Sequence, residues 1–160
     1  MREVGKSIYV GGDVDCFCDN RNGWAVIHAC KTCHKRRIGY SGNLGQSNPC
    51  YLIKKDQNHL FLNLVDMDQT LMPLFTNPIM KAAMEFIDEN IGSKRILIHC
   101  NEGHSRAPSI ALLYLARESS IPNGDYEEAK VAFLRNYPTY LPARGIESYM
   151  RQNWIDLLKL

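Results

Sequence analysis

The segment from Arg95 to Ala116 constrains the fold of this chain more than any other part of its sequence. An apolar run ends at Cys100, Arg106 follows six residues later, and an apolar stretch with helical spacing comes directly after it. Gly103 lies within the loop, where a positive φ costs little, and Pro108 falls in the first helical turn, where no donor is lost. A strand, a short loop and a helix in this order surround the cysteine with backbone N–H groups and a positive helix end. Such a loop binds a tetrahedral dianion and favours a thiolate over a thiol.

The spacing of Cys100 and Arg106 alone is weak evidence, because Cys30 and Arg36 have the same spacing. The residues between that second pair include no glycine, and no helical pattern follows them. The second match therefore lacks the turn and the helix that would hold an anion. We interpret Cys100 as the functional cysteine and Cys30 as a buried one at the end of an apolar strand.

The rest of the chain predicts alternating strands and helices in a single domain of residues 1–160. Strands are expected at 7–11, 24–30, 60–65 and 95–99, helices at 77–91, 108–118, 125–137 and 145–158, and a long loop at 39–49. This order predicts an α/β fold with a central mixed or parallel sheet flanked by helices. In such sheets ligands bind beyond the carboxyl ends of the strands, where the Cys100 loop is expected.

Composition and charge narrow the class of protein. The net charge of +2 is too small to indicate a nucleic-acid partner or a membrane surface. No run of 18 apolar residues and no basic and apolar leader is present, so we expect a soluble cytoplasmic protein whose six cysteines are reduced. The sequence does not specify the oligomeric state.

The motif His99-Cys100-x-x-Gly103-x-Ser105-Arg106-x-Pro108 resembles the signature of the cysteine-dependent dual-specificity protein phosphatases, and most closely the compact forms of bacteria and phages. Further similar segments are Ile8–Gly11, Trp24–Lys31, Leu60–Asp66 and the residues Pro142, Gly145 and Gln152. The resemblance implies a protein-tyrosine-phosphatase-like fold and hydrolysis of phosphotyrosine, phosphoserine and phosphothreonine through a cysteinyl-phosphate. It implies a phosphorylated protein or peptide as partner, with no cofactor and no metal.

In this reading Cys100 is the nucleophile, and the guanidinium of Arg106 grips two phosphoryl oxygens. The loop residues that would surround the phosphate are Asn101, Glu102, Gly103, His104 and Ser105. The resemblance implies that His99 orders the loop and tunes the thiol, although a buried histidine of the core explains it equally well.

The leaving oxygen needs a proton, and two aspartates follow the strand predicted at 60–65. Asp66 fits the apolar alternation of that strand, whereas Asp68 fits the spacing to the cysteine that is usual in the family. We favour Asp66 and keep Asp68 as the alternative.

One position departs from the family, in which the arginine is usually followed by a serine or threonine that supports the departing thiolate. Ala107 has no hydroxyl, so we expect slow hydrolysis of the phosphoenzyme. The absence of this hydroxyl also leaves a second interpretation open, in which the protein is a phosphate-binding module with little turnover. The loop interior contains Glu102 and no Lys or Arg, which argues against inositide substrates. Non-protein phosphates such as a nucleotide or an RNA end remain an alternative.

The other cysteines raise the question of a zinc site or a redox pair. Cys30 and Cys33 have the spacing of two zinc ligands, but Cys16 and Cys18 are too close for the usual second pair. His28 and Cys50 are further candidate ligands. We expect free thiols and leave zinc and redox pairing open.

Overall fold

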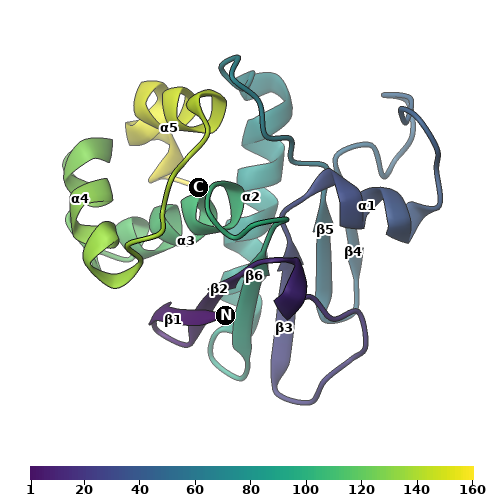
Figure 1. The fold of residues 1–160 in the computed structure, drawn as a ribbon, viewed down its shortest axis with the longest axis horizontal. Coiled ribbons are helices and arrows are strands. Elements are labelled where there is room, and N and C mark those ends of the chain that lie inside the picture. The colour runs from purple at the N-terminus through teal and green to yellow at the C-terminus, as the bar shows by residue number, and fades with distance from the viewer.

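A mixed six-stranded sheet forms the centre of the computed structural model, which describes residues 1–160 (Figure 1). In spatial order the strands are β1 (Arg2–Gly5), β2 (Ile8–Gly11), β6 (Arg95–His99), β3 (Trp24–His28), β5 (His59–Leu62) and β4 (Ile53–Asp56). The four inner strands are parallel, and the edge strands β1 and β4 are antiparallel to their neighbours. The carboxyl ends of β6 and β3 therefore meet at one edge of the sheet.

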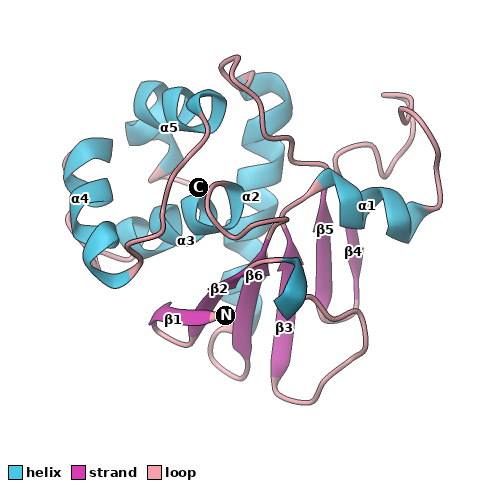
Figure 2. Ribbon diagram, viewed as in Figure 1, coloured by secondary structure: helices cyan, strands magenta, loops and turns pink.

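The chain also contains five α-helices and one short 3-10 helix, and the last three helices follow the final strand β6 (Figure 2). The helices are η1 (Asp13–Asp15), α1 (Lys31–Ile38), α2 (Pro73–Asn90), α3 (Arg106–Arg117), α4 (Tyr126–Asn136) and α5 (Arg144–Leu157). Helices α2 and α3 pack against the sheet, and α4 and α5 pack against them as a further layer. No helix is long and apolar enough to cross a membrane.

The two faces of the sheet are covered differently, because successive side chains of a strand point to opposite faces. Ile96 and Ile98 belong to the main core of 41 buried residues, which the helices cover. Leu97 packs instead with Val26 and Phe17 in a separate small cluster on the other face. The segment between β2 and β3, which carries Phe17, closes that second face.

Several element boundaries differ from the sequence predictions. The strand expected at 24–30 ends at His28, and Cys30 is the N-cap residue of α1, a helix that the sequence analysis did not predict. The strand expected at 60–65 is His59–Leu62, and α2 begins at Pro73 rather than at 77. Because Cys33 and its neighbours lie in α1, the second Cys-x5-Arg match cannot wrap around an anion.

Candidate active site

The loop that connects β6 to α3 has its tight turn at Gly103. This residue has a φ of +77°, a conformation that side chains disfavour. A Cβ atom here would lie 2.9 Å from the carbonyl carbon and oxygen of Gly11, at the end of β2. The turn therefore requires glycine, and it presses the loop against the neighbouring strand.

The carbonyl groups of the loop are bound by residues outside it. The Asn101 carbonyl accepts from the Asp13 N–H at 2.9 Å, and the Gly103 carbonyl accepts from the Tyr137 hydroxyl at 3.0 Å. The His104 carbonyl accepts from the Leu141 N–H at 2.9 Å. In contrast, the N–H groups from Asn101 to Ser105 have no backbone acceptor. These donors are left available for an anion, as buried N–H groups need a partner.

A cavity of about 460 Å³ opens over this loop. Cys100 lies at its floor and is only 1% exposed, where the carboxyl end of β6 meets the loop. The lining residues are Asp66, Cys100, Asn101, Glu102, His104, Ser105, Arg106, Leu141, Pro142 and Ala143. Gly103 is buried behind the loop, so of the predicted phosphate-binding residues it alone does not line the cavity.

Arg106 and Asp66 lie next to each other in the wall of the cavity. The Arg106 Nε lies 3.3 Å from Asp66 Oδ2, close enough for an ion pair. The angle is nevertheless too poor for a hydrogen bond, so Nε has no hydrogen-bond partner although Arg106 is buried. Its Nη1 donates to the Leu64 carbonyl at 3.2 Å, which fixes the side chain and leaves Nε as a donor for a ligand.

Ser105 ties Asp66 to the wall of the cavity. Its hydroxyl donates to Asp66 Oδ1 at 2.9 Å and accepts from the Ala143 N–H at 3.0 Å. The structure thus brings Asp66 to the loop that carries Cys100. Asp68 is exposed and does not line the cavity, because the carbonyls beside it pack against Gly145 at the start of α5.

His99 points away from the cavity, as expected for the residue next to Cys100 in a strand. It is fully buried on the opposite face, where its Nε2 lies 2.7 Å from Nδ1 of His28. Burial lowers the pKa of His28 to about 4, so this imidazole is neutral near neutral pH. His99 therefore belongs to a second polar cluster behind the loop, described below.

The sequence analysis missed most of the wall opposite the loop. Leu141 and Ala143 line the cavity and bind the loop through backbone N–H groups, and Tyr137, outside the cavity, binds the Gly103 carbonyl through its hydroxyl. A contact made by the backbone leaves no mark on residue type, so in this wall only Pro142, noted through the family resemblance, gave any signal.

Comparison of the sequence with protein-family models and with curated proteins gives no match. Solved structures do match the fold over nearly the whole chain. The human tyrosine phosphatase-like serine/threonine/tyrosine-interacting protein has a TM-score of 0.67 at 16% identity, covering 100% of this chain and 98% of that chain. DUSP15 has a TM-score of 0.65 at 15% identity, covering 99% and 90%.

A third match is PTPMT1 in complex with PI(5)P, with a TM-score of 0.63 at 15% identity and coverage of 99% and 96%. The chain therefore has the protein-tyrosine-phosphatase-like fold of the dual-specificity phosphatases, and the predicted fold class is confirmed.

Proposed function

We propose that the protein is a cysteine-dependent phosphatase that hydrolyses phosphate monoesters through a cysteinyl-phosphate. The observation that carries this proposal is the loop itself, where Cys100 lies at the floor of a cavity, the loop N–H groups have no backbone acceptor, and Nε of Arg106 has no hydrogen-bond partner. These donors match the spread negative charge of a phosphoryl group in transfer, for which positioning and electrostatics supply most of the catalysis.

In the first step the Cys100 thiolate attacks phosphorus, the S–P bond forms, and the P–O bond to the leaving group breaks. Asp66 donates the proton that the leaving oxygen requires. In the free protein the Asp66 carboxylate pairs with Arg106. A bound phosphate dianion would compete for that guanidinium and so free the Asp66 carboxyl to face the leaving oxygen.

In the second step a water molecule attacks phosphorus and the Asp66 carboxylate takes its proton. The S–P bond breaks, which regenerates the thiolate and releases inorganic phosphate. Ala107 is fully buried and offers no hydroxyl to the departing sulfur, so this step is the slow one in our proposal.

We infer that the substrate is a phosphorylated protein or peptide, with phosphotyrosine, phosphoserine and phosphothreonine all accepted. Arg106 is the only lysine or arginine that lines the cavity, and Glu102 adds a negative charge, which suits one phosphate better than several. The exposed side chain of Leu141 at the rim offers an apolar surface to a phenyl ring or a peptide.

The test is hydrolysis of p-nitrophenyl phosphate by the wild type and by Cys100→Ser, with initial rates measured in EDTA. We expect turnover by the wild type and a loss of at least about 10⁴-fold in the variant, because the displacement has no other nucleophile. Rapid quenching with ³²P-labelled substrate should trap phosphate on Cys100. Absence of any labelled cysteine at every pH tested would favour a phosphate-binding module without turnover.

Substrate class is tested by comparing kcat/KM for three phosphopeptides with kcat/KM for nucleotides and 5′-phosphorylated RNA. We expect at least one phosphopeptide to exceed the other substrates by about tenfold or more. The reverse order would assign the same chemistry to a non-protein phosphate.

A further inference from the structure

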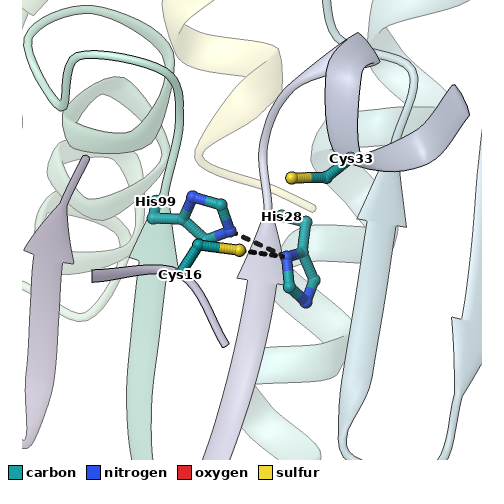
Figure 3. Close-up of side chains that lie close together, drawn as sticks. All are labelled: Cys16, His28, Cys33 and His99. Carbon is teal, nitrogen blue, oxygen red and sulfur yellow. Dashed lines mark hydrogen bonds between the residues drawn. The ribbon is translucent and has the colours of Figure 1, made fainter. Parts of the chain in front are cut away.

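Four side chains that can bind a metal converge behind the catalytic loop (Figure 3). Cys16 follows η1, His28 ends β3, Cys33 lies in the first turn of α1, and His99 ends β6. Their ligand atoms, two sulfurs and two ring nitrogens, all lie within 4.8 Å of one another. We propose that Cys16, His28, Cys33 and His99 form a zinc site.

The distances suit a tetrahedral ion. Zinc bonds of about 2.0–2.3 Å place the ligand atoms of such a site roughly 3.3–3.8 Å apart. Cys16 Sγ lies 3.7 Å from His28 Nδ1, and His99 Nε2 lies 2.7 Å from the same nitrogen. An ion at the centre would draw the sulfurs inward and separate the two rings by about half an ångström, which small side-chain rotations allow.

The chemistry of the donors indicates zinc rather than a harder cation. Two thiolates and two imidazoles in tetrahedral arrangement are typical of zinc, whereas magnesium and calcium select oxygen ligands. The cluster contains no carboxylate. All four positions are filled by the protein and three of the four residues are buried, so the site is closed and structural, with no open position for a substrate.

His59 completes the environment of the metal. Its Nδ1 lies 3.0 Å from Nε2 of His28. A metal on Nδ1 of His28 leaves the proton on Nε2, and His59 is in place to accept it. Metal-binding histidines commonly have such a partner, which fixes the ring and its tautomer.

The site would join three segments to the base of the catalytic loop. Cys16 belongs to the segment that covers one face of the sheet, Cys33 anchors α1, and His99 is the residue before the nucleophile Cys100. The zinc site is independent of the proposed phosphatase activity, because it lies on the opposite face of β6 and needs no substrate.

The first test is the metal content of the full chain, purified without chelators and measured by inductively coupled plasma mass spectrometry. We expect about one zinc per chain in the wild type. Cys18→Ser is the matched control, because Cys18 is exposed and lies two residues from Cys16 but outside the cluster. It should keep the metal, whereas Cys33→Ser should lose it.

Two further variants separate loss of the ligand from loss of the fold. Cys33→His preserves a ligand and should retain zinc, with circular dichroism unchanged. Cys100→Ser should retain zinc too. Disappearance of the metal in Cys100→Ser would place it at the nucleophile and overturn the proposal.

Cobalt(II) provides a test that needs no variant. We expect chelator-treated wild type to bind one Co²⁺ and to show the intense visible bands of a tetrahedral site together with thiolate-to-cobalt charge transfer. Competition with a chromophoric chelator should show zinc affinity falling in Cys16→Ser by more than the roughly 10–100-fold typical of losing an outer partner. Equal affinity in wild type and Cys16→Ser, or a Cys16–Cys33 disulfide in a metal-free wild type, would overturn the site.

A measurement of thermal stability distinguishes failure of the proposed zinc site from failure of the proposed activity. Free zinc at about 1,000 times its Kd should raise the Tm of the chelated wild type by roughly 8–16 °C. Initial rates with p-nitrophenyl phosphate should be the same with and without EDTA while the chain stays folded. An inactive protein with one tightly bound zinc would refute only the activity, and an active protein with no zinc and no change in Tm would refute only the site.

Discussion

Replacement of Gly103 by alanine tests quantitatively the geometry of the loop that connects β6 to α3. Two costs arise at this position. The φ of +77° is unfavourable for any residue with a Cβ, by roughly 1–2 kcal/mol. The Cβ would also meet the backbone of Gly11 at 2.9 Å and the Gly12 nitrogen at 3.2 Å, and these main-chain atoms cannot rotate aside as a side chain would.

Gly39 separates the two costs. It ends α1 with a φ of +84°, and a Cβ there would meet nothing within 4 Å. We therefore expect Gly39→Ala to lower the free energy of unfolding by about 1–2 kcal/mol, the cost of the backbone conformation alone. Gly103→Ala should add about 1–3 kcal/mol for the overlap, giving a total of about 2–5 kcal/mol.

Urea unfolding of the two variants measures these free energies, provided that the m-value is unchanged. The kcat/KM for p-nitrophenyl phosphate should fall more than about tenfold in Gly103→Ala, because a displaced loop no longer aims its N–H groups at the phosphate. It should be unchanged in Gly39→Ala. Equal unfolding free energies for both variants, together with wild-type activity in Gly103→Ala, would refute the assigned loop geometry.

Three further outcomes are expected. Asp66→Asn should lower kcat for phenyl phosphate by about 10²–10⁴-fold but affect p-nitrophenyl phosphate less, since a good leaving group needs no proton. Asp68→Asn should change kcat for neither substrate. A large loss in Asp68→Asn and none in Asp66→Asn would make Asp68 the general acid. Ala107→Ser should reduce the pre-steady-state burst and raise kcat, and an unchanged burst and turnover would contradict a slow second step. Burial raises the pKa of Tyr140 to about 12, from about 10 in the unfolded chain, so the stability it contributes is present below pH 10 and lost as the pH rises towards 12. Tyr140→Phe should flatten that part of the curve of unfolding free energy against pH.

The sequence predicted the inner part of the fold well, because its elements carry strong local patterns. The strand Arg95–His99 has the predicted bounds, and α4 and α5 agree with the predicted helices to within one residue at each end. The agreement is poorer where tertiary contacts determine the bounds of an element. The helix expected at 77–91 already begins at Pro73, a residue that suits the first turn of a helix.

The two edge strands and α1 were not predicted, for physical reasons. Strands β1 and β4 have four residues each and bury only one residue between them, so neither shows an apolar alternation. Helix α1 contains four lysines and arginines in eight residues and buries only Cys33 and His34, which leaves no apolar stripe. These elements are stabilised by the neighbours against which they pack. The sequence of the element itself does not reveal those neighbours.

The geometry of the loop between β6 and α3 was predictable because one continuous segment supplies Cys100, the turn at Gly103 and Arg106. The proposed general acid could be narrowed only to Asp66 or Asp68, since both aspartates follow the same strand. The structure favours Asp66 in our proposal, because the hydroxyl of Ser105, 39 residues further on, donates to Asp66 and not to Asp68.

The proposed zinc site shows why spacing rules fail for ligands assembled by a sheet. The local rule favoured Cys30 with Cys33, but Cys30 is the N-cap residue of α1 and lies outside the cluster. The ligands that do meet are brought together by the parallel register of β3 and β6, which places His28 beside His99. Strand alternation then sends His99 and Cys100 to opposite faces. Two consecutive residues therefore face two different sites: His99 faces the proposed zinc site, and Cys100 faces the cavity of the proposed phosphatase.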